Sequence, residues 1–429
     1  MMKRIIQWSY SFLIFPLILS VVGIIALIDR KYRRALLQRF KTLQLIKEFF
    51  DSAEIPQSNN RVIIHCASMG EFEHIKPLIQ QLYKVGNNTV IITFFSPSGY
   101  EHVKSFPGVA LIVYQPLDFA GTWRKFYQLV KPALLIISKH DAWPNQVWVA
   151  EEQQIPVFLV NASLSANSSR TGLLARKFFG RIYESFTGIF AISQRDAQRF
   201  ENLLKIKNVT SVGDTKFDQV INRKKQSQKV KIIDEPWLRK DLVFIMGSVW
   251  PEDLIHLDEA VKSLLQHYPD LKVIIVPHQL HEELINHLKN YFQPMGVAMF
   301  SDNQYPASSR VLIIDKVGIL ADCYKYAHIA YVGGSFKQGI HNVMEPAVYG
   351  LPVLFGPRHQ NSFDAIQLTK LGGGIAVRNA DEAYRYLSDL IDNESYRQKT
   401  GNFALTFALE NSGAVDKLMK YWEKYLKIN

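Results

Sequence analysis

The feature that most constrains this chain is an uncharged, apolar segment close to its N-terminus. From Ile5 to Ile28 the sequence contains no Asp, Glu, Lys or Arg over 24 residues. At about 1.5 Å per residue, a helix of this length can cross a hydrocarbon core about 30 Å thick. A cleaved signal peptide is the alternative, but no short apolar core followed by a small-x-small cleavage site is present. We therefore expect a membrane anchor. It either spans the bilayer or, if Pro16 and Gly23 bend the helix, lies partly in one leaflet.

The basic residues around this segment predict its orientation and account for part of the formal net charge of +11. Two precede it, and a denser cluster follows: Lys3 and Arg4, then Arg30, Lys31, Arg33, Arg34, Arg39 and Lys41. The heavier cluster stays in the cytoplasm under the positive-inside rule. We expect the remaining chain at the cytoplasmic face of a membrane, with membrane lipids as partners. No aromatic-plus-basic recognition motif supports a nucleic-acid partner.

The two cysteines, Cys66 and Cys323, provide neither a disulfide framework nor a zinc-ligand spacing. Both lie in apolar stretches, which predicts buried thiols in a reducing compartment.

After residue 60, short β-branched runs alternate with amphipathic stretches, a pattern typical of βα units and parallel sheets. The predicted strands are Val62–Cys66, Thr89–Phe94, Ala110–Tyr114, Leu134–Ile137, Pro156–Asn161, Gly188–Ala191, Leu242–Met246, Lys272–Val276, Val311–Ile314, Ile329–Val332 and Pro352–Phe355. A polar, basic stretch at 223–240 is predicted to be a linker. The expected organisation is an anchor and basic segment (1–50), a first α/β domain (51–222), the linker, and a second α/β domain with terminal helices (241–429). Doubly wound domains bind ligands at the carboxyl ends of their strands, so a ligand cleft between them is expected.

The first candidate for chemistry follows strand Val62–Cys66. Glu71 is expected in the first turn of the next helix, where the helix N-terminus stabilises a carboxylate and where it can accept a proton from a hydroxyl group. An ordinary first-turn acidic residue explains the same position equally well. Lys216 ends the first domain and can reach a phosphate or a sugar carboxylate, although a lone surface lysine is the simpler explanation.

Two glycine-rich turns in the second half predict a nucleotide site. Gly247 and Ser248 follow one strand, and Gly333 and Gly334 follow another, with Asn342 and Glu345 shortly after. Backbone N–H groups at such turns bind phosphate, and a carboxylate such as Glu345 can accept the hydroxyls of a ribose. Neither turn matches the Walker or GxGxxG pattern, and no histidines stand at metal-ligand spacing. We expect no metal and no bound cofactor.

Taken together, these segments resemble the Kdo transferases, which add 3-deoxy-D-manno-octulosonic acid (Kdo) to lipid A precursors. The resemblance covers most of the chain and is carried by RKYRRALLQRF after the anchor, HCASMGEFE, SPSGY, DAWPN, NASLS, GDTKFD, GSVWPED, VPH, GGSF, GIHNVMEPAVYGLPVLFGP and the late GGG.

The resemblance implies a GT-B fold, in which two Rossmann-like domains face a cleft, and an inverting transfer of Kdo from CMP-Kdo to a lipid A precursor in lipopolysaccharide synthesis at the inner membrane. Glu71 then corresponds to the catalytic base and Lys216 to a lysine that stabilises the transition state. The implied donor-binding residues are Gly247, Ser248, Pro277, His278, Lys316, Val317, Gly318, Gly333, Gly334, Asn342, Val343, Met344 and Glu345.

One segment departs from the family pattern. The family carries ETELWPN, whereas this chain has Lys139 and Asp141 at the two acidic positions. Asp141 keeps the second carboxylate as a candidate catalytic group, and Lys139 reverses the first charge. Alternative functions are a membrane-associated GT-B transferase that uses a UDP-sugar, an epimerase of similar architecture, and an inactive protein that binds nucleotide sugars.

Overall fold

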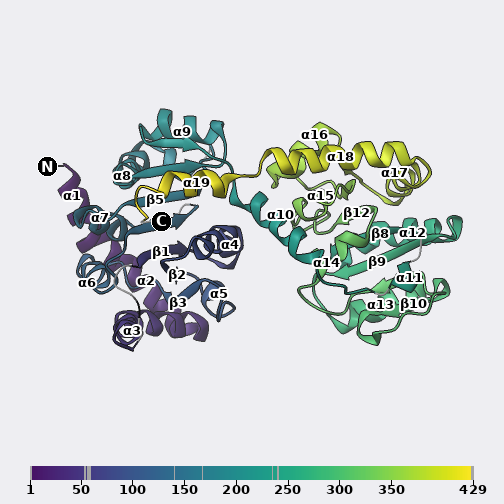
Figure 1. Cartoon of the computed structure of the whole chain (residues 1–429), viewed down its shortest axis with the longest axis horizontal. Coiled ribbons are helices and arrows are strands. Elements are labelled where there is room, and N and C mark those ends of the chain that lie inside the picture. Colours follow the sequence, from purple (N-terminus) through teal and green to yellow (C-terminus); the bar gives the residue numbers. More distant parts are fainter. Residues whose placement is uncertain are drawn as a thin grey trace. The chain divides into compact units, whose positions relative to one another are not determined.

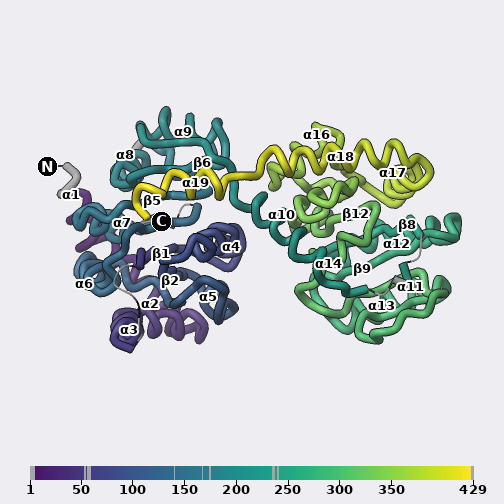
Figure 2. Tube along the Cα trace, viewed as in Figure 1, coloured from purple at the N-terminus to yellow at the C-terminus, as the bar shows by residue number. Residues whose placement is uncertain are grey.

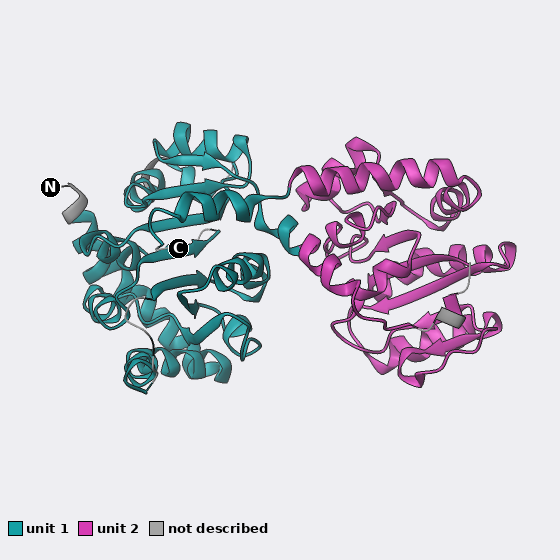
Figure 3. Cartoon of the chain, in the orientation of Figure 1, with its two compact units in different colours: residues 1–219, 412–429 teal, residues 220–411 magenta. Residues whose placement is uncertain are grey.

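The computed structural model describes residues 2–52, 55, 59–139, 141–166, 168–233, 235–238 and 241–426. The chain divides into two compact units, unit 1 (residues 1–219 and 412–429) and unit 2 (residues 220–411), coloured separately in Figure 3. Within the described residues, each unit contains one seven-stranded parallel sheet. The predicted α/β fold class of two parallel-sheet domains is confirmed.

In unit 1 the strand order is β3-β2-β1-β4-β5-β6-β7, as labelled in Figure 1. The central strands are buried on both faces because helices cover the sheet, which explains their continuous apolar runs. The elements are α1 (Met2–Ser9), η1 (Tyr10–Ile14), α2 (Phe15–Ile28), α3 (Arg30–Ser52), β1 (Asn60–Cys66), α4 (Met69–Lys84), β2 (Asn88–Phe94), α5 (Pro97–Tyr100), β3 (Val109–Tyr114), α6 (Ala120–Val130), β4 (Leu134–Ser138), α7 (Pro144–Glu152), β5 (Val157–Ala162), η2 (Ser169–Thr171), α8 (Leu173–Tyr183), β6 (Gly188–Ala191), α9 (Gln194–Leu204), β7 (Val209–Ser211), α10 (Thr215–Ser227) and α19 (Ala414–Trp422).

In unit 2 the strand order is β10-β11-β9-β8-β12-β13-β14. The elements are α11 (Glu235–Leu238), β8 (Leu242–Val249), α12 (Pro251–His267), β9 (Leu271–Pro277), α13 (Glu282–Phe292), η3 (Gln293–Met295), β10 (Val297–Met299), η4 (Phe300–Asp302), β11 (Val311–Ile313), α14 (Leu320–Cys323), η5 (Tyr324–Tyr326), β12 (Ile329–Val332), α15 (Met344–Ala347), β13 (Val353–Phe355), α16 (Phe363–Leu371), β14 (Gly374–Ala376), α17 (Ala380–Asp392) and α18 (Glu394–Glu410).

Both sheets contain a point where the direction of strand addition reverses. In unit 1 it lies between β1 and β4, and in unit 2 between β8 and β12. The loops that leave the carboxyl ends of two such strands diverge to opposite faces and leave room for a ligand. Glu71 follows β1 and Asp141 follows β4, while Gly247 lies near the end of β8 and Gly333 follows β12. The predicted site residues therefore gather at the switch points.

The N-terminal segment forms a helical hairpin on unit 1. The most apolar window of Ile5–Ile28 has a mean hydropathy of 2.8, and 11% of it is buried, so the segment is long and apolar enough to cross a membrane. Helix α2 continues into α3, which packs against β3, and both helices appear in purple in Figure 2. In α3, Ile46 joins the unit 1 core and the Thr42 hydroxyl donates to the carbonyl of Tyr114. Residues 30–52 therefore belong to unit 1 and are more than a juxtamembrane connection.

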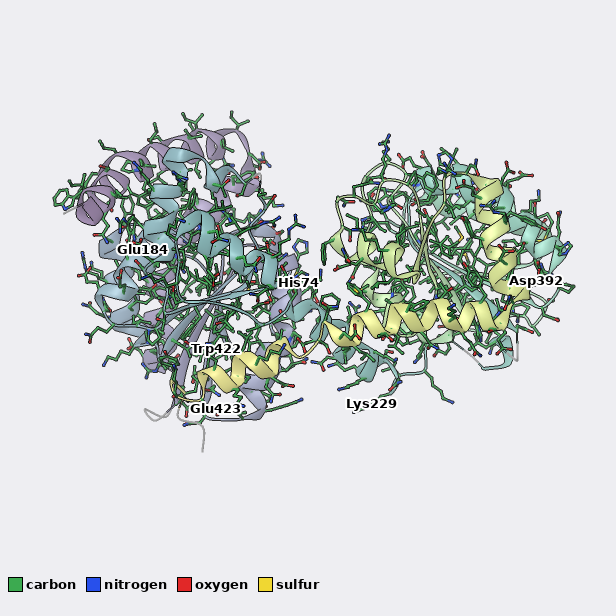
Figure 4. All side chains as sticks on the ribbon, turned by 90° about the horizontal axis from the view of Figure 1, so that it is seen from above. His74, Glu184, Lys229, Asp392, Trp422 and Glu423 are labelled. Atoms are coloured by element: carbon green, nitrogen blue, oxygen red, sulfur yellow. The ribbon has the colours of Figure 1, made fainter. Side chains whose placement is uncertain are left out.

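The C-terminal helix α19 corrects the predicted domain boundary at 241–429. Residues 412–429 belong to unit 1, where Trp422, labelled in Figure 4, packs against Phe158 and Phe190 of the sheet. The apolar face of α19 is buried on unit 1. Asp218 fixes its start, because its carboxylate accepts the backbone N–H groups of Gly413 at 2.8 Å and Ala414 at 3.1 Å.

The predicted linker at 223–240 is also only partly irregular. Residues up to Ser227 extend helix α10, and Glu235–Leu238 form the short helix α11. Trp237 is fully buried and donates its indole N–H to the carbonyl of Ser309, which ties this stretch to unit 2. Both cysteines are buried free thiols, as predicted.

Candidate functional site

Glu71 lies in the first turn of α4, directly after the carboxyl end of β1. Its Oε2 accepts the backbone N–H of Ala67 at 2.6 Å, which holds the carboxylate in the turn between strand and helix. The residue is 8% exposed, and burial raises the pKa of its carboxyl group above the ordinary value. The Ala67 N–H and the charges of His65 and Lys139 oppose this rise in pKa, whereas Asp141 adds to it. A carboxylate with a raised pKa is a stronger base, as proton abstraction requires.

Asp141 lies beside the same turn because β4 is the parallel neighbour of β1. Its Oδ2 is 3.0 Å from Nε2 of His65, the fully buried residue before Cys66 in β1. On its other side, His65 Nδ1 is 2.9 Å from the Thr93 hydroxyl of β2. When Nε2 donates its proton to the carboxylate, Nδ1 accepts the hydroxyl proton of Thr93, and all polar atoms of the ring are satisfied. This supporting role of His65 was not predicted from the sequence.

Lys139 is held in an unusual backbone conformation at the end of β4. Its φ is +59°, a left-handed value that is uncommon for a residue other than glycine. The Lys139 N–H nevertheless donates to the carbonyl of Val160 at 2.8 Å, which continues the pairing with β5. Its charge acts on both Glu71 and His74. The structure therefore brings a cation, in place of the acidic residue expected from the family pattern, to the surroundings of Glu71.

Lys216 belongs to a second group of charges at the start of α10. Its Nζ lies 3.7 Å from Oδ2 of Asp214, and Asp214 Oδ1 lies 3.9 Å from Nδ1 of His74. Burial lowers the pKa of His74 to about 4, although the charge of Asp214 opposes this. The neighbouring Thr215 hydroxyl donates to the carbonyl of His74, which joins the α10 start to α4. Since Lys139 and Lys216 both act on His74, unit 1 presents two lysines around the helix that carries Glu71.

The glycine turns of unit 2 serve close packing. A Cβ on Gly247 would lie 2.3 Å from the Tyr324 hydroxyl, and one on Gly333 would lie 2.2 Å from the carbonyl oxygen of Ser248. The Gly334 N–H donates to the buried carboxylate of Asp253, and the Gly333 N–H donates to the carbonyl of Gly247. These amides are satisfied within the protein, so the predicted phosphate contacts cannot come from them in this conformation.

Ser248 also differs from the prediction. It lies inside β8 at an irregularity of the ladder, with φ at +53°, and is no helix-start residue. Helix α12 begins three residues later, at Pro251.

An aromatic stack occupies the carboxyl ends of β8 and β9 and the loop after β12. Trp250 and His341 are coplanar, with an interplanar angle of 1°, and the indole N–H donates to His341 Nε2 at 2.8 Å. His278 lies on both rings, with centroid distances of 4.4 Å to each. Burial lowers the pKa of His341 to about 4, and the proximity of His278 adds to the effect. Only His278 of these three was predicted; an aromatic residue after a strand carries no signal of stacking by itself.

The remaining predicted donor-site residues lie on nearby loops of unit 2. Asn342 caps the following turn, since its Oδ1 accepts the backbone N–H of Met344 at 3.1 Å, while Val343 and Met344 are buried. Glu345 Oε1 lies 3.8 Å from an Arg223 nitrogen, and Arg223 also donates to the carbonyl of Gly318 at 3.4 Å. Pro277 ends β9, and Lys316 and Val317 precede Gly318, with Val317 80% exposed. Among the described residues no group of three His, Cys, Asp or Glu side chains has the geometry of a metal site.

Comparison with known proteins identifies relatives for the whole chain. Residues 35–219 match the family described as 3-deoxy-D-manno-octulosonic-acid transferase (kdotransferase). The 3-deoxy-D-manno-octulosonic acid transferase of Haemophilus influenzae is 28% identical, and the match covers 100% of both chains. The enzyme of the same description from Aquifex aeolicus is 27% identical over 81% of this chain and 91% of its own length. Over its whole length this chain is therefore similar to a Kdo transferase.

A solved structure supports the fold of this chain independently of sequence. The UDP-GlcNAc 2-epimerase from Neisseria meningitidis bound to UDP-GlcNAc superposes with a TM-score of 0.58 at 15% identity, covering 85% of this chain and 100% of the epimerase. At this identity the likeness shows the fold alone. The family match spans the segments that carry Glu71, Asp141 and Lys216, which the geometry brings to adjacent loops of unit 1.

Proposed function

We propose that this protein is an inverting glycosyltransferase that moves Kdo from CMP-Kdo to a lipid A precursor. The observation that carries the proposal is the buried carboxylate of Glu71 at the switch point of unit 1, in a chain related over its full length to a Kdo transferase. Glu71 takes the proton of an acceptor hydroxyl while that oxygen attacks the anomeric carbon of Kdo. The bond from this carbon to the CMP phosphate breaks, and CMP leaves with the bonding electrons.

Three further groups have roles in this proposal. Burial raises the pKa of Glu71, and Asp141, fixed by His65, adds to that rise and so favours a strong base. Lys216 offers a positive charge for the carboxylate of Kdo or the leaving phosphate. In unit 2, the loops that carry His278, Lys316 and Asn342 provide the donor site. The reaction as written needs no metal or bound cofactor, and we expect full activity after treatment with EDTA.

The N-terminal hairpin suits a substrate that resides in a membrane. The outward face of α2 exposes large apolar side chains, among them Leu17 at 67% and Ile28 at 84%, which favours lipid contact over burial in a soluble core. The basic residues that open α3 meet anionic headgroups and acceptor phosphates. We therefore propose attachment at the cytoplasmic face of the inner membrane, where the charge asymmetry around the segment would hold unit 1.

The test is transfer from CMP-Kdo to a tetraacylated lipid A precursor by the detergent-solubilised full chain. Glu71→Gln should lower the turnover by about 10²- to 10⁴-fold, the usual contribution of a general base. Glu73→Gln is the matched control, because Glu73 pairs with Lys76 on the same helix and is not part of the Glu71 turn. A folded parent that binds CMP without transferring Kdo would identify the inactive nucleotide-sugar-binding alternative. Preferential competition by UDP over CMP would identify a UDP-sugar enzyme.

A further inference from the structure

The N-terminal hairpin encloses an apolar cavity of about 140 Å³ on unit 1. Its walls come from Phe15, Leu19 and Val22 of α2, from Ala35 and Arg39 of α3, and from loops that follow β2, β3 and β4. A cavity of about 150 Å³ lined by apolar side chains stays dry and binds a benzene-sized molecule. The volume therefore suits a hydrocarbon segment of about six carbon atoms.

Two residues that line this hairpin cavity have buried polar atoms without a hydrogen-bond partner among the described residues. Gln115 is 1% exposed, and its Oε1 has no hydrogen-bond partner among the described residues; the same holds for the buried Nε1 of Trp143. Both residues line the cavity. Arg39 lies beside them, and its guanidinium donates to the carbonyl groups of Gln115 and Phe95. Buried unpaired polar groups are costly, so a ligand with both hydrogen-bonding groups and a hydrocarbon part is favoured here.

The cavity connects the lipid-facing helix with the surroundings of the proposed base. On one side, α2 turns its other face outward, where Leu17 and Ile24 are 67% and 60% exposed. On the other side, the Phe95 ring packs on Trp143 at 5.0 Å, and the backbone N–H of Ser96 donates to the carbonyl of Ala67, which adjoins the Glu71 turn. The charge of Asp141 acts on both Arg39 and Glu71. A chain held in the cavity is thereby tethered close to Glu71.

Arg39 supplies a permanent positive charge at the inner wall. Burial lowers the pKa of its guanidinium to about 10, opposed by Tyr114 and Asp141, so the group remains cationic at neutral pH. The cation also lies over the Phe95 ring at 4.6 Å, which fixes its position. The combination of an apolar pocket and a fixed cation matches an acylated, anionic lipid.

We propose that the hairpin cavity binds the first carbon atoms of one fatty acyl chain, next to its carbonyl group, of the lipid that accepts the sugar. The inference rests on the proposed function and adds a recognition site for the hydrocarbon part of the acceptor. The Gln115 oxygen can accept the N–H of an amide-linked chain, the Trp143 N–H can donate to an ester or amide carbonyl, and Arg39 attracts the phosphate of the lipid. The cavity thereby allows the protein to distinguish an acylated acceptor from the same acceptor without acyl chains.

The kinetic test fills the cavity without touching the base. Ala35→Phe places a ring in the cavity from α3, and Val22→Phe does so from α2, which covers the case in which the first variant misfolds. Leu37→Phe is the control, because Leu37 is 58% exposed on the outside of α3 and does not line the cavity. We expect at least a tenfold rise in KM for the tetraacylated acceptor with little change in kcat, and unchanged kinetics with the deacylated acceptor. Equal effects on both acceptors would overturn the proposal.

A binding measurement keeps this inference separate from catalysis. The acceptor lipid with a diazirine close to the carbonyl group of one acyl chain is photo-crosslinked to the full chain in detergent, and the modified peptides are identified by mass spectrometry. Labels on α2 and α3 that disappear in Ala35→Phe would support the cavity even if no transfer were observed. Equal labelling by a diazirine phosphatidylglycerol that the acceptor cannot displace would show a general lipid-filled space and refute an acceptor site.

Discussion

Asp118 joins the membrane-facing hairpin to the loop that leads into α7, and its replacement by asparagine is a sharp test of this arrangement. The carboxylate is 1% exposed and accepts four hydrogen bonds. Oδ1 accepts from Trp123 Nε1 and the Gln146 N–H, and Oδ2 accepts from the Tyr10 hydroxyl and the Asn145 N–H. An asparagine keeps the shape but has only one acceptor oxygen.

The expected cost follows from counting the partners that Asp118→Asn leaves unsatisfied. If the amide oxygen replaces Oδ1, the NH₂ group faces the Tyr10 hydroxyl, which can rotate to accept, and the Asn145 N–H, which cannot. At pH 8, where the parent carboxyl group is ionised, a buried unsatisfied N–H costs about 1–3 kcal/mol, and the remaining bonds lose their charged acceptor. We expect a loss of about 3 kcal/mol, which lowers Tm by about 6–12 °C for a domain of this size.

The pH dependence of this stability difference has a definite sign. Burial raises the pKa of Asp118 from 3.8 to about 7, against the four hydrogen bonds that lower it. Between these values the native state binds more protons than the unfolded state, so the contribution is largest at acidic pH and is lost as the pH rises through 7. Asp118→Asn lacks this titration, and its stability deficit relative to the parent should shrink from pH 5 to pH 8.

The assay is thermal unfolding of the detergent-solubilised chain at a fixed scan rate, followed by tryptophan fluorescence. Tyr10→Phe is the companion variant, because it removes one bond to a charged acceptor and should cost about 1.5–3 kcal/mol. A decrease of less than about 2 °C for Asp118→Asn would refute the reasoning. It would mean that the amide finds acceptors at this position and that the four donors are not all directed at a carboxylate.

Three further predictions test other parts of the molecule. Asp141→Asn removes a charge that raises the pKa of Glu71 and should shift the acidic limb of kcat/KM to lower pH, whereas Lys139→Met should shift it to higher pH; shifts in the same direction would contradict the assignment of Glu71 as the base. Burial and His278 lower the pKa of His341 to about 4, and Trp250→Phe keeps the stack but removes the indole donor to Nε2, which frees this nitrogen to take a proton; the pKa should then rise in an NMR titration, and an unchanged value would show that the hydrogen bond does not contribute to it. Asp218→Ala removes the acceptor at the start of α19 and should cost about 1–2 kcal/mol and expose the C-terminus to limited proteolysis, whereas Asp416→Ala on the same helix should not.

The strands and the switch points were predictable because buried parallel strands leave continuous apolar runs in the sequence. β1, β4, β8 and β12 were all identified, and with them the positions of Glu71, Asp141 and the glycine turns. The strands that were missed, β7, β10 and β14, have three residues each and contain small or polar residues, whereas the equally short β11 and β13 consist of large apolar residues. The return of α19 to unit 1 depends on a contact between Asp218 and Gly413, a long-range interaction that no local pattern encodes.

The finer chemistry of the site depended on contacts that residue types alone cannot show. Glycines after a strand predict close backbone approach, but only the structure shows that the group approached at Gly334 is the Asp253 carboxylate. Similarly, His65 resembles any polar residue in a strand until its ring is found between Asp141 and Thr93. The partners of a buried polar group are set by tertiary packing. For this reason the positions of these residues were easier to predict from the sequence than their contacts.

The same residues that attach the hairpin also support the proposed active site, which has a mechanistic consequence. Asp118 accepts the Asn145 N–H at the start of α7, and the segment just before α7 carries Asp141 and Trp143. Tyr10 and the Asn145 side chain, which accepts from Ser11, connect that segment to the N-terminal helix. A displacement of the hairpin is therefore transmitted to the Asp141 carboxylate that acts on Glu71. If this coupling operates, Tyr10→Phe should alter the pH dependence of kcat/KM under conditions where the protein remains fully folded, which a purely structural anchor would leave unchanged.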